Sequence, residues 1–161
     1  MHCKIGNYSI NQTIRLTQGE PRIDMSVKLD WTGNPRIGEP GIEFRADNPR
    51  KAFYDDRYKL LVYLPTQIAN QQIYKDAPFD VCESRLENTF FNRWDSIKHN
   101  IILNWVDVAS KDNSCGLSLF TDHTTSYAHG KDFPLALNVQ YAGKGLWGRD
   151  YIIDRPTEIS Y

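Results

Sequence analysis

The sequence lacks the excess of one charge sign that polyanionic partners require. Its 161 residues contain 19 Lys and Arg against 20 Asp and Glu, which gives a formal net charge of −1. Binding to nucleic acid or to an anionic membrane surface depends on an excess of basic side chains. The composition therefore predicts no nucleic acid and no membrane among the partners.

Long apolar runs are also absent. No run approaches the ~20 residues that a membrane-spanning helix needs. The N-terminal stretch MHCKIGNYSI lacks the order of a secretory signal, in which a basic segment precedes an apolar one. These features leave the localisation of the protein unknown.

Cysteine is scarce, with only Cys3, Cys82 and Cys115. The three are far apart, odd in number and never in a CxxC spacing, so they predict neither a structural zinc site nor a disulfide framework. We expect buried free thiols.

Short catalytic motifs are missing as well. The sequence contains no GxSxG, P-loop, HxD, HxH or HExxH, which are patterns of nucleophilic, nucleotide-binding and metal-dependent sites. We therefore predict no catalytic residue, no metal ligand and no cofactor within this chain.

Strand patterns, in contrast, recur along the sequence. In PRIDMSVKLDW (residues 21–31), apolar and polar residues alternate strictly, as a strand with one buried face requires. Residues 13–17 form a hairpin with it through the turn at residues 18–21. Further strands are expected at residues 58–64, 101–108, 115–121, 135–141 and 157–161, the first two of them central in a sheet because both faces are apolar.

These patterns predict an all-β fold, a mainly antiparallel β-sandwich in a single domain of residues 1–161. Residues 32–56 are too irregular for a helix and long for a connection in a sandwich. Residues 88–100 form a second irregular region, which could be a short helical turn or an aromatic lid. The alternation in residues 157–161 continues to the last residue, so we expect a truncated fragment of a larger chain.

Polar and aromatic residues cluster in TDHTTSYAHGKD (residues 121–132), which we expect to be a loop. The missing ligand spacings disfavour a metal site in this segment. A turn, in which side-chain oxygens accept hydrogen bonds from main-chain N–H groups, accounts for much of its polar composition. The aromatic rings near loops suit sugar stacking. A second candidate segment, GKGLWGRD, presents Trp147 between basic residues. The predicted substrate-binding residues are Asp122, His123, Tyr127, Lys144, Trp147 and Arg149.

Four segments together resemble a known family. GEPRIDMSVKLDW resembles the strand that opens the C-terminal region of the α-mannosidases of glycoside hydrolase family 38. YKLLVYLP, APFDVCESR and NWVDVASKDNSCGLSLFTDHTTSY are similar to later segments of that region, in the same order. The resemblance implies a supersandwich of the galactose-mutarotase-like kind.

The resemblance also implies an activity for the larger chain. Its members are zinc-dependent retaining glycosidases that remove α-linked mannose through a covalent glycosyl-enzyme. Their nucleophile and zinc ligands belong to an N-terminal catalytic domain that this chain lacks. The implied partners are that domain and mannosides, and the chain alone is expected to be inactive.

Two other functions remain open from the sequence. One is a free-standing carbohydrate-binding, lectin-like sandwich, whose site would consist of Trp147 and the loop of Tyr127. The other is a purely structural interaction module.

Overall fold

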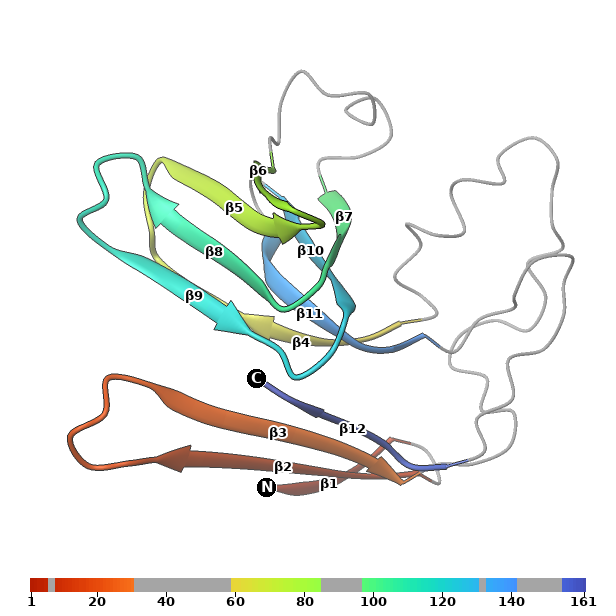
Figure 1. The fold of residues 1–161 in the computed structure, drawn as a ribbon. Coiled ribbons are helices and arrows are strands. Elements are labelled where there is room, and N and C mark those ends of the chain that lie inside the picture. The colour runs from red at the N-terminus through yellow and green to blue at the C-terminus, as the bar shows by residue number, and fades with distance from the viewer. Residues whose placement is uncertain (6–7, 31–58, 85–96, 131–132, 142–154) are drawn as a thin grey trace, which may run out of the picture. The chain divides into compact units, whose positions relative to one another are not determined.

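The computed structural model describes residues 1–5, 8–30, 59–84, 97–130, 133–141 and 155–161, which form strands and no helix (Figure 1). The described part contains no helix long and apolar enough to cross a membrane. The strands are β1 (His2–Ile5), β2 (Tyr8–Leu16), β3 (Ile23–Asp30), β4 (Lys59–Leu64), β5 (Gln71–Ala77), β6 (Asp80–Glu83), β7 (Ile97–Ile102), β8 (Trp105–Ser110), β9 (Gly116–Phe120), β10 (Thr125–Gly130), β11 (Phe133–Tyr141) and β12 (Thr157–Ser160).

The chain divides into two compact units. Unit 1 comprises residues 1–60 and 139–161, and unit 2 comprises residues 61–138. The single domain expected from the sequence stays a prediction, and each unit is described by itself.

Unit 1 contains an antiparallel sheet in the order β1-β2-β3-β12. The predicted hairpin between β2 and β3 is confirmed. Its turn contains Gly19 at a φ of 83°, a left-handed conformation that glycine adopts without steric cost. The main-chain N–H of Glu20 closes the turn on the carbonyl of Thr17 at 3.1 Å.

The alternation predicted for residues 21–31 is present along β3, but only half of its apolar face is buried. Val27 and Leu29 lie in the core, where Ile10 and Ile159 pair with them. Ile23, towards the turn, is more than half exposed, as are its neighbours Ile14 and Leu16 on β2. The opposite face carries ion pairs that involve Arg22 and Lys28.

Unit 2 contains most of two further sheets, ordered β4-β11-β10-β7 and β6-β5-β8-β9 (Figure 1). Side chains connect them directly. The Lys75 ammonium group donates to the carbonyl of Ile101 at 2.8 Å, and the Asn100 amide donates to the Ser84 hydroxyl at 3.3 Å.

The facing sides of these two sheets supply the apolar core of unit 2. The buried residues of one sheet are Ile73, Val106, Val108 and Leu119, and those of the other are Ile102, Tyr127, Leu135 and Leu137. Ala128 and Ala136, on the other face of the second sheet, are buried too. The predicted all-β, mainly antiparallel β-sandwich is confirmed.

Two strand predictions were wrong in detail. Residues 101–108 are not one central strand: β7 ends at Ile102, β8 begins at Trp105, and the two belong to different sheets. The reason is a turn at Leu103 and Asn104 that a distant carboxylate, Asp76, holds in place. In addition, β4 lies at the end of its sheet in the described part of the chain, and its Tyr63 is half exposed.

The loop prediction for residues 121–132 also needs correction. Only residues 121–124 form a turn, because Thr125–Gly130 is the strand β10. The cysteines are free, as expected, but Cys3 and Cys115 are exposed and Cys82 is only partly buried. Cys3 lies on β1, the end strand of its sheet in the described part of the chain, and Cys115 lies in the turn between β8 and β9.

Candidate functional site

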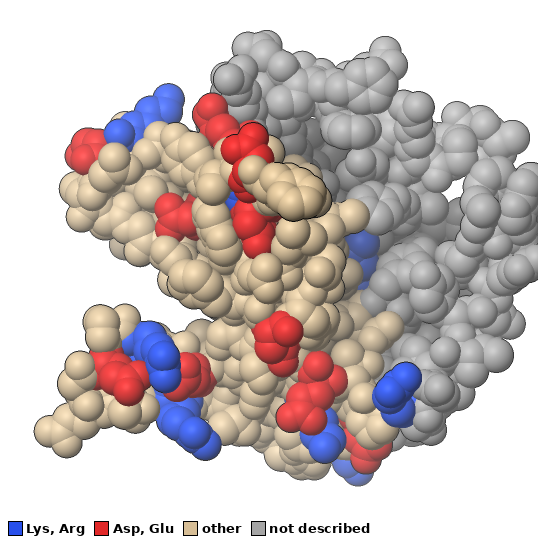
Figure 2. Space-filling model, in the orientation of Figure 1, with Lys and Arg blue, Asp and Glu red and all other residues tan. Residues whose placement is uncertain are grey.

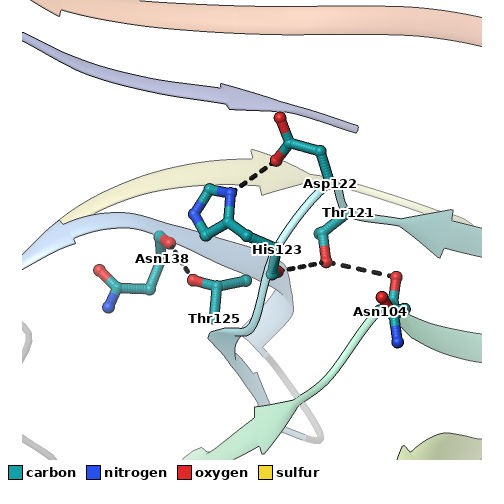
Figure 3. A network of polar contacts seen from close by, with 6 residues as sticks. All are labelled: Asn104, Thr121, Asp122, His123, Thr125 and Asn138. Carbon is teal, nitrogen blue, oxygen red and sulfur yellow. Dashed lines mark hydrogen bonds and ion pairs between the residues drawn. The ribbon is translucent and has the colours of Figure 1, made fainter.

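The turn between β9 and β10 is fixed by a buried threonine, as Figure 3 shows. The main-chain N–H of Thr121 donates to the carbonyl of Asn104 at 2.6 Å. The Thr121 hydroxyl lies 2.9 Å from the carbonyl of His123 and 3.2 Å from that of Asn104. Because these contacts occupy the polar groups at the base of the turn, the next two side chains project outwards.

The start of β10 is anchored to β11 as well. The Thr125 hydroxyl donates to the carbonyl of Asn138 at 2.7 Å (Figure 3), and the Asn138 side-chain amide donates to the Ser126 hydroxyl at 3.1 Å. The turn is thus held at both ends by side-chain contacts to neighbouring strands. Such fixed elements suit a binding site, since they position a ligand-binding group precisely.

The turn presents an aspartate–histidine pair to solvent. Nδ1 of His123 lies 2.6 Å from Oδ1 of Asp122, and the two side chains are 47% and 44% exposed (Figure 3). A carboxylate bound to one ring nitrogen fixes the orientation of the imidazole and leaves the other nitrogen, Nε2, for a ligand. The pair can therefore accept and donate hydrogen bonds to hydroxyl groups.

Tyr127, also predicted to bind substrate, lies in the core with 1% of its surface exposed. Its hydroxyl has no hydrogen-bond partner of proper geometry. Burial raises the pKa of Tyr127 to about 12, although the nearby Ser84 and Asn100 side chains have the smaller effect of lowering this pKa. The structure therefore places this side chain between the sheets of unit 2.

His129, two residues further along β10, is a buried polar group of the same segment that was not among the predicted substrate-binding residues. It is 2% exposed, and its Nδ1 has no hydrogen-bond partner. Burial lowers the pKa of His129, because the charged imidazolium would lose its hydration. His129 is therefore neutral at pH 7 and lies on the same face of β10 as Tyr127.

The other predicted site residues, Lys144, Trp147 and Arg149, lie outside the described residues. Of the six, the structure brings together Asp122 and His123. Within the described ranges, no three His, Cys, Asp or Glu side chains come together as a metal site requires.

A second polar turn, between β8 and β9, was also missed. The Asp112 carboxylate accepts hydrogen bonds from the Ser110 hydroxyl at 2.6 Å and from Ser114, through its main-chain N–H at 3.1 Å and its hydroxyl at 2.9 Å. These contacts, led by that of Ser110, lower the pKa of Asp112 to about 2. The sequence DNS, with an aspartate followed two residues later by serine, was the available signal.

Comparison with known proteins gives one match. A family model described as "Glycosyl hydrolases family 38 C-terminal domain" matches residues 1–138. No curated protein and no solved structure matches the chain.

Proposed function

We propose that the chain is the non-catalytic part of a retaining α-mannosidase, because it belongs to glycoside hydrolase family 38 and matches the C-terminal domain of that family. A C-terminal domain of this family implies a larger chain that also carries a catalytic domain. In the proposal, that larger chain removes terminal α-linked mannose from oligosaccharides.

The chemical step belongs to the catalytic domain. Retaining glycosidases use one carboxylate as nucleophile and a second as acid and base. Zinc, bound in the catalytic domain, would contribute Lewis-acid contacts to the sugar hydroxyls. In the proposal, the zinc ligands belong to the catalytic domain, as the resemblance to the family implies.

The contribution of this chain to the sugar pocket is the Asp122–His123 pair. Mannose offers several hydroxyl groups, and the pair combines a carboxylate acceptor with an imidazole nitrogen on a fixed turn. Lys144, Trp147 and Arg149 complete the proposed pocket wall, Trp147 by stacking on the apolar face of the ring. These contacts orient the sugar and transfer no proton in the reaction.

The second proposed contribution is mechanical support. Packed sheets are rigid because their interiors are filled like crystals. The buried Val106, Val108 and Leu119 hold β8 and β9, and β9 leads directly into the turn of Asp122. A sandwich of this kind keeps a pocket wall in position against the catalytic domain.

The single observation that carries the proposal is the family match over residues 1–138. It is tested with the full-length chain and the 161-residue chain, each assayed with an aryl α-mannoside and added zinc. We expect saturable hydrolysis by the full-length chain and none above buffer by the shorter one.

Two results would contradict the proposal. Saturable hydrolysis by the 161-residue chain would place catalytic groups within it. Mannose binding by that chain as tight as binding by the full-length protein, followed by Trp fluorescence, would favour a lectin-like module.

A further inference from the structure

The turn between β5 and β6 projects an unusually exposed aromatic side chain. Ala77 pairs with Asp80, so the turn consists of Pro78 and Phe79 alone. Phe79 is 108% exposed relative to an extended reference, more than any other large apolar side chain of the described residues. The ring therefore makes almost no contact with its own unit.

The backbone at Phe79 is unfavourable for a bulky residue. Its φ is 67°, in the left-handed region. A tight turn with proline first often needs a positive φ at its second position, which glycine or asparagine normally supplies. Phenylalanine there is strained, because its Cβ lies too close to the backbone.

Both the strain and the exposure of Phe79 disfavour this residue in the isolated unit. Strain of this kind persists where another contact compensates for it. A large aromatic side chain compensates best by inserting into an apolar pocket of a partner, as the central residues of protein interfaces do. The outlier thus indicates a contact with a partner.

The residues around Phe79 indicate what kind of partner surface could bind it. Val81, two residues further along, is 56% exposed and lies on β6, the end strand of its sheet in the described part of the chain. Asp80 and Glu83 are exposed on the same strand, and Figure 2 shows acidic side chains gathered over this part of the molecule. Phe79, Asp80 and Val81 form what we call the Phe79 tip.

The partner that we infer for this side chain follows from the family match. A family 38 C-terminal domain implies a catalytic domain in the same polypeptide. We propose that the Phe79 tip docks into an apolar socket with a basic rim on that catalytic domain. Opposite charges at the rim would match Asp80 and fix the orientation of the two domains. The inference rests on the proposed supporting role and identifies the residues that perform it.

Hydroxyl-radical footprinting of the full-length chain tests the docking without any substitution. Phe120, 63% exposed at the opposite end strand β9 of the same sheet, is the internal control. By exposure alone, Phe79 should be oxidised faster than Phe120. Docking reverses this order, because the ring of Phe79 is then covered. Oxidation of Phe79 at least as fast as that of Phe120 would overturn the proposal.

The variant Phe79→Gly gives a second test with opposite expected signs. Glycine relieves the backbone strain, so without docking the variant should raise the melting temperature of the full-length chain or leave it unchanged. With docking, the loss of the buried ring should lower it by a few degrees. Phe120→Ser should change it little. A Phe79→Gly chain as stable as the wild type, or more stable, would reject the docking.

The outcome is separable from that of the proposed function. Hydrolysis of an aryl α-mannoside is measured on the same wild-type preparation. An active chain with a rapidly oxidised Phe79 rejects the docking alone. An inactive chain with a protected Phe79 rejects the mannosidase activity alone.

Discussion

The carboxylate of Asp76 on β5 accepts two hydrogen bonds from Asn104, one from the main-chain N–H at 2.6 Å and one from the side-chain amide at 3.3 Å. The N–H of Leu103 adds a third at 2.9 Å. Leu103 and Asn104 separate β7 from β8, which belong to different sheets. One buried carboxylate therefore fixes the point at which the chain passes between the two layers of unit 2.

Asp76→Ala should destabilise the protein by about 2–4 kcal/mol, because it leaves buried main-chain donors without an acceptor. Asp76→Asn keeps the shape and one acceptor oxygen, and should cost less. Urea unfolding followed by circular dichroism measures both. An Asp76→Ala variant within about 0.5 kcal/mol of the wild type, which is the range of surface substitutions, would contradict this role.

The same turn shows what the sequence could not predict. IILNWVDV is apolar at positions that suit one continuous strand, and only Asn104 hints at a break. The group that holds the turn, Asp76, is 28 residues from Asn104 in the sequence. Local patterns predict elements well when the determining contacts are local, as in the hairpin of β2 and β3. Local patterns fail where a side chain distant in the sequence determines where a strand ends.

The strand β10 was missed for a different reason. Its sequence, Thr125–Gly130, contains threonine, serine, tyrosine and histidine, which resemble a polar loop. Threonine and tyrosine also favour strands, and the central residues of β10 are buried on both faces. Burial of a polar strand depends on covering layers that the sequence does not display, so Tyr127 was placed in a loop although it lies in the core.

The candidate site was predicted in part. The sequence placed Asp122 and His123 in a turn, and the structure adds their direct contact and the anchor, Thr121. Adjacent residues in a turn are easy to predict as neighbours. The orientation of their side chains depends on hydrogen bonds to Asn104, which lies in another turn.

Tyr127→Phe should be nearly neutral at pH 7, within about 1 kcal/mol, or slightly stabilising, since it removes a buried hydroxyl without a partner. Tyr127→Ala, which empties the space of the ring, should cost about 3–5 kcal/mol. Chemical denaturation of both variants measures the difference. A Tyr127→Phe loss as large as that of Tyr127→Ala would show that the hydroxyl is essential.

The raised pKa of Tyr127 also predicts the behaviour of the wild type in alkali. The phenol ionises near pH 10 in the unfolded chain but only near pH 12 in the folded one. The stability that this group contributes is thus present below pH 10 and is lost as the pH rises towards 12. Tyr127→Phe should lose less stability over that interval.

His129 predicts a loss of stability in mild acid. Burial lowers its pKa in the folded state, so below about pH 6.5 the unfolded chain binds a proton that the folded chain resists. The stability that neutral His129 contributes is fully present above that pH and is lost as the pH falls. Urea midpoints at pH 7.5 and 5.5 should differ less for His129→Gln than for the wild type.

Thr124→Ala provides the control for this measurement, because Thr124 is exposed in the turn before β10 and does not titrate. It should keep the full pH dependence of the wild type. An equal reduction of the pH dependence by the two substitutions would show that burial of His129 is not the cause.

The proposed pocket predicts a specific kinetic pattern in the full-length chain. Asp122→Asn and His123→Gln should each raise KM for an aryl α-mannoside by roughly tenfold, the loss expected for one hydrogen bond to a charged group. The kcat should change little, because the pair binds substrate and transition state alike. Thr124→Ala, in the same exposed turn, should leave KM unchanged.

A double variant sharpens this test. Asp122 orients the imidazole of His123, so the two substitutions remove one unit, and the double variant should lose less than the sum of the single losses. Additive losses would mean that the two groups bind separately. The result that would exclude the turn from the sugar pocket is an unchanged KM in both single variants, with unfolding temperatures equal to that of the wild type. Exposed side chains that neither stabilise the fold nor bind the ligand have no other role in hydrolysis.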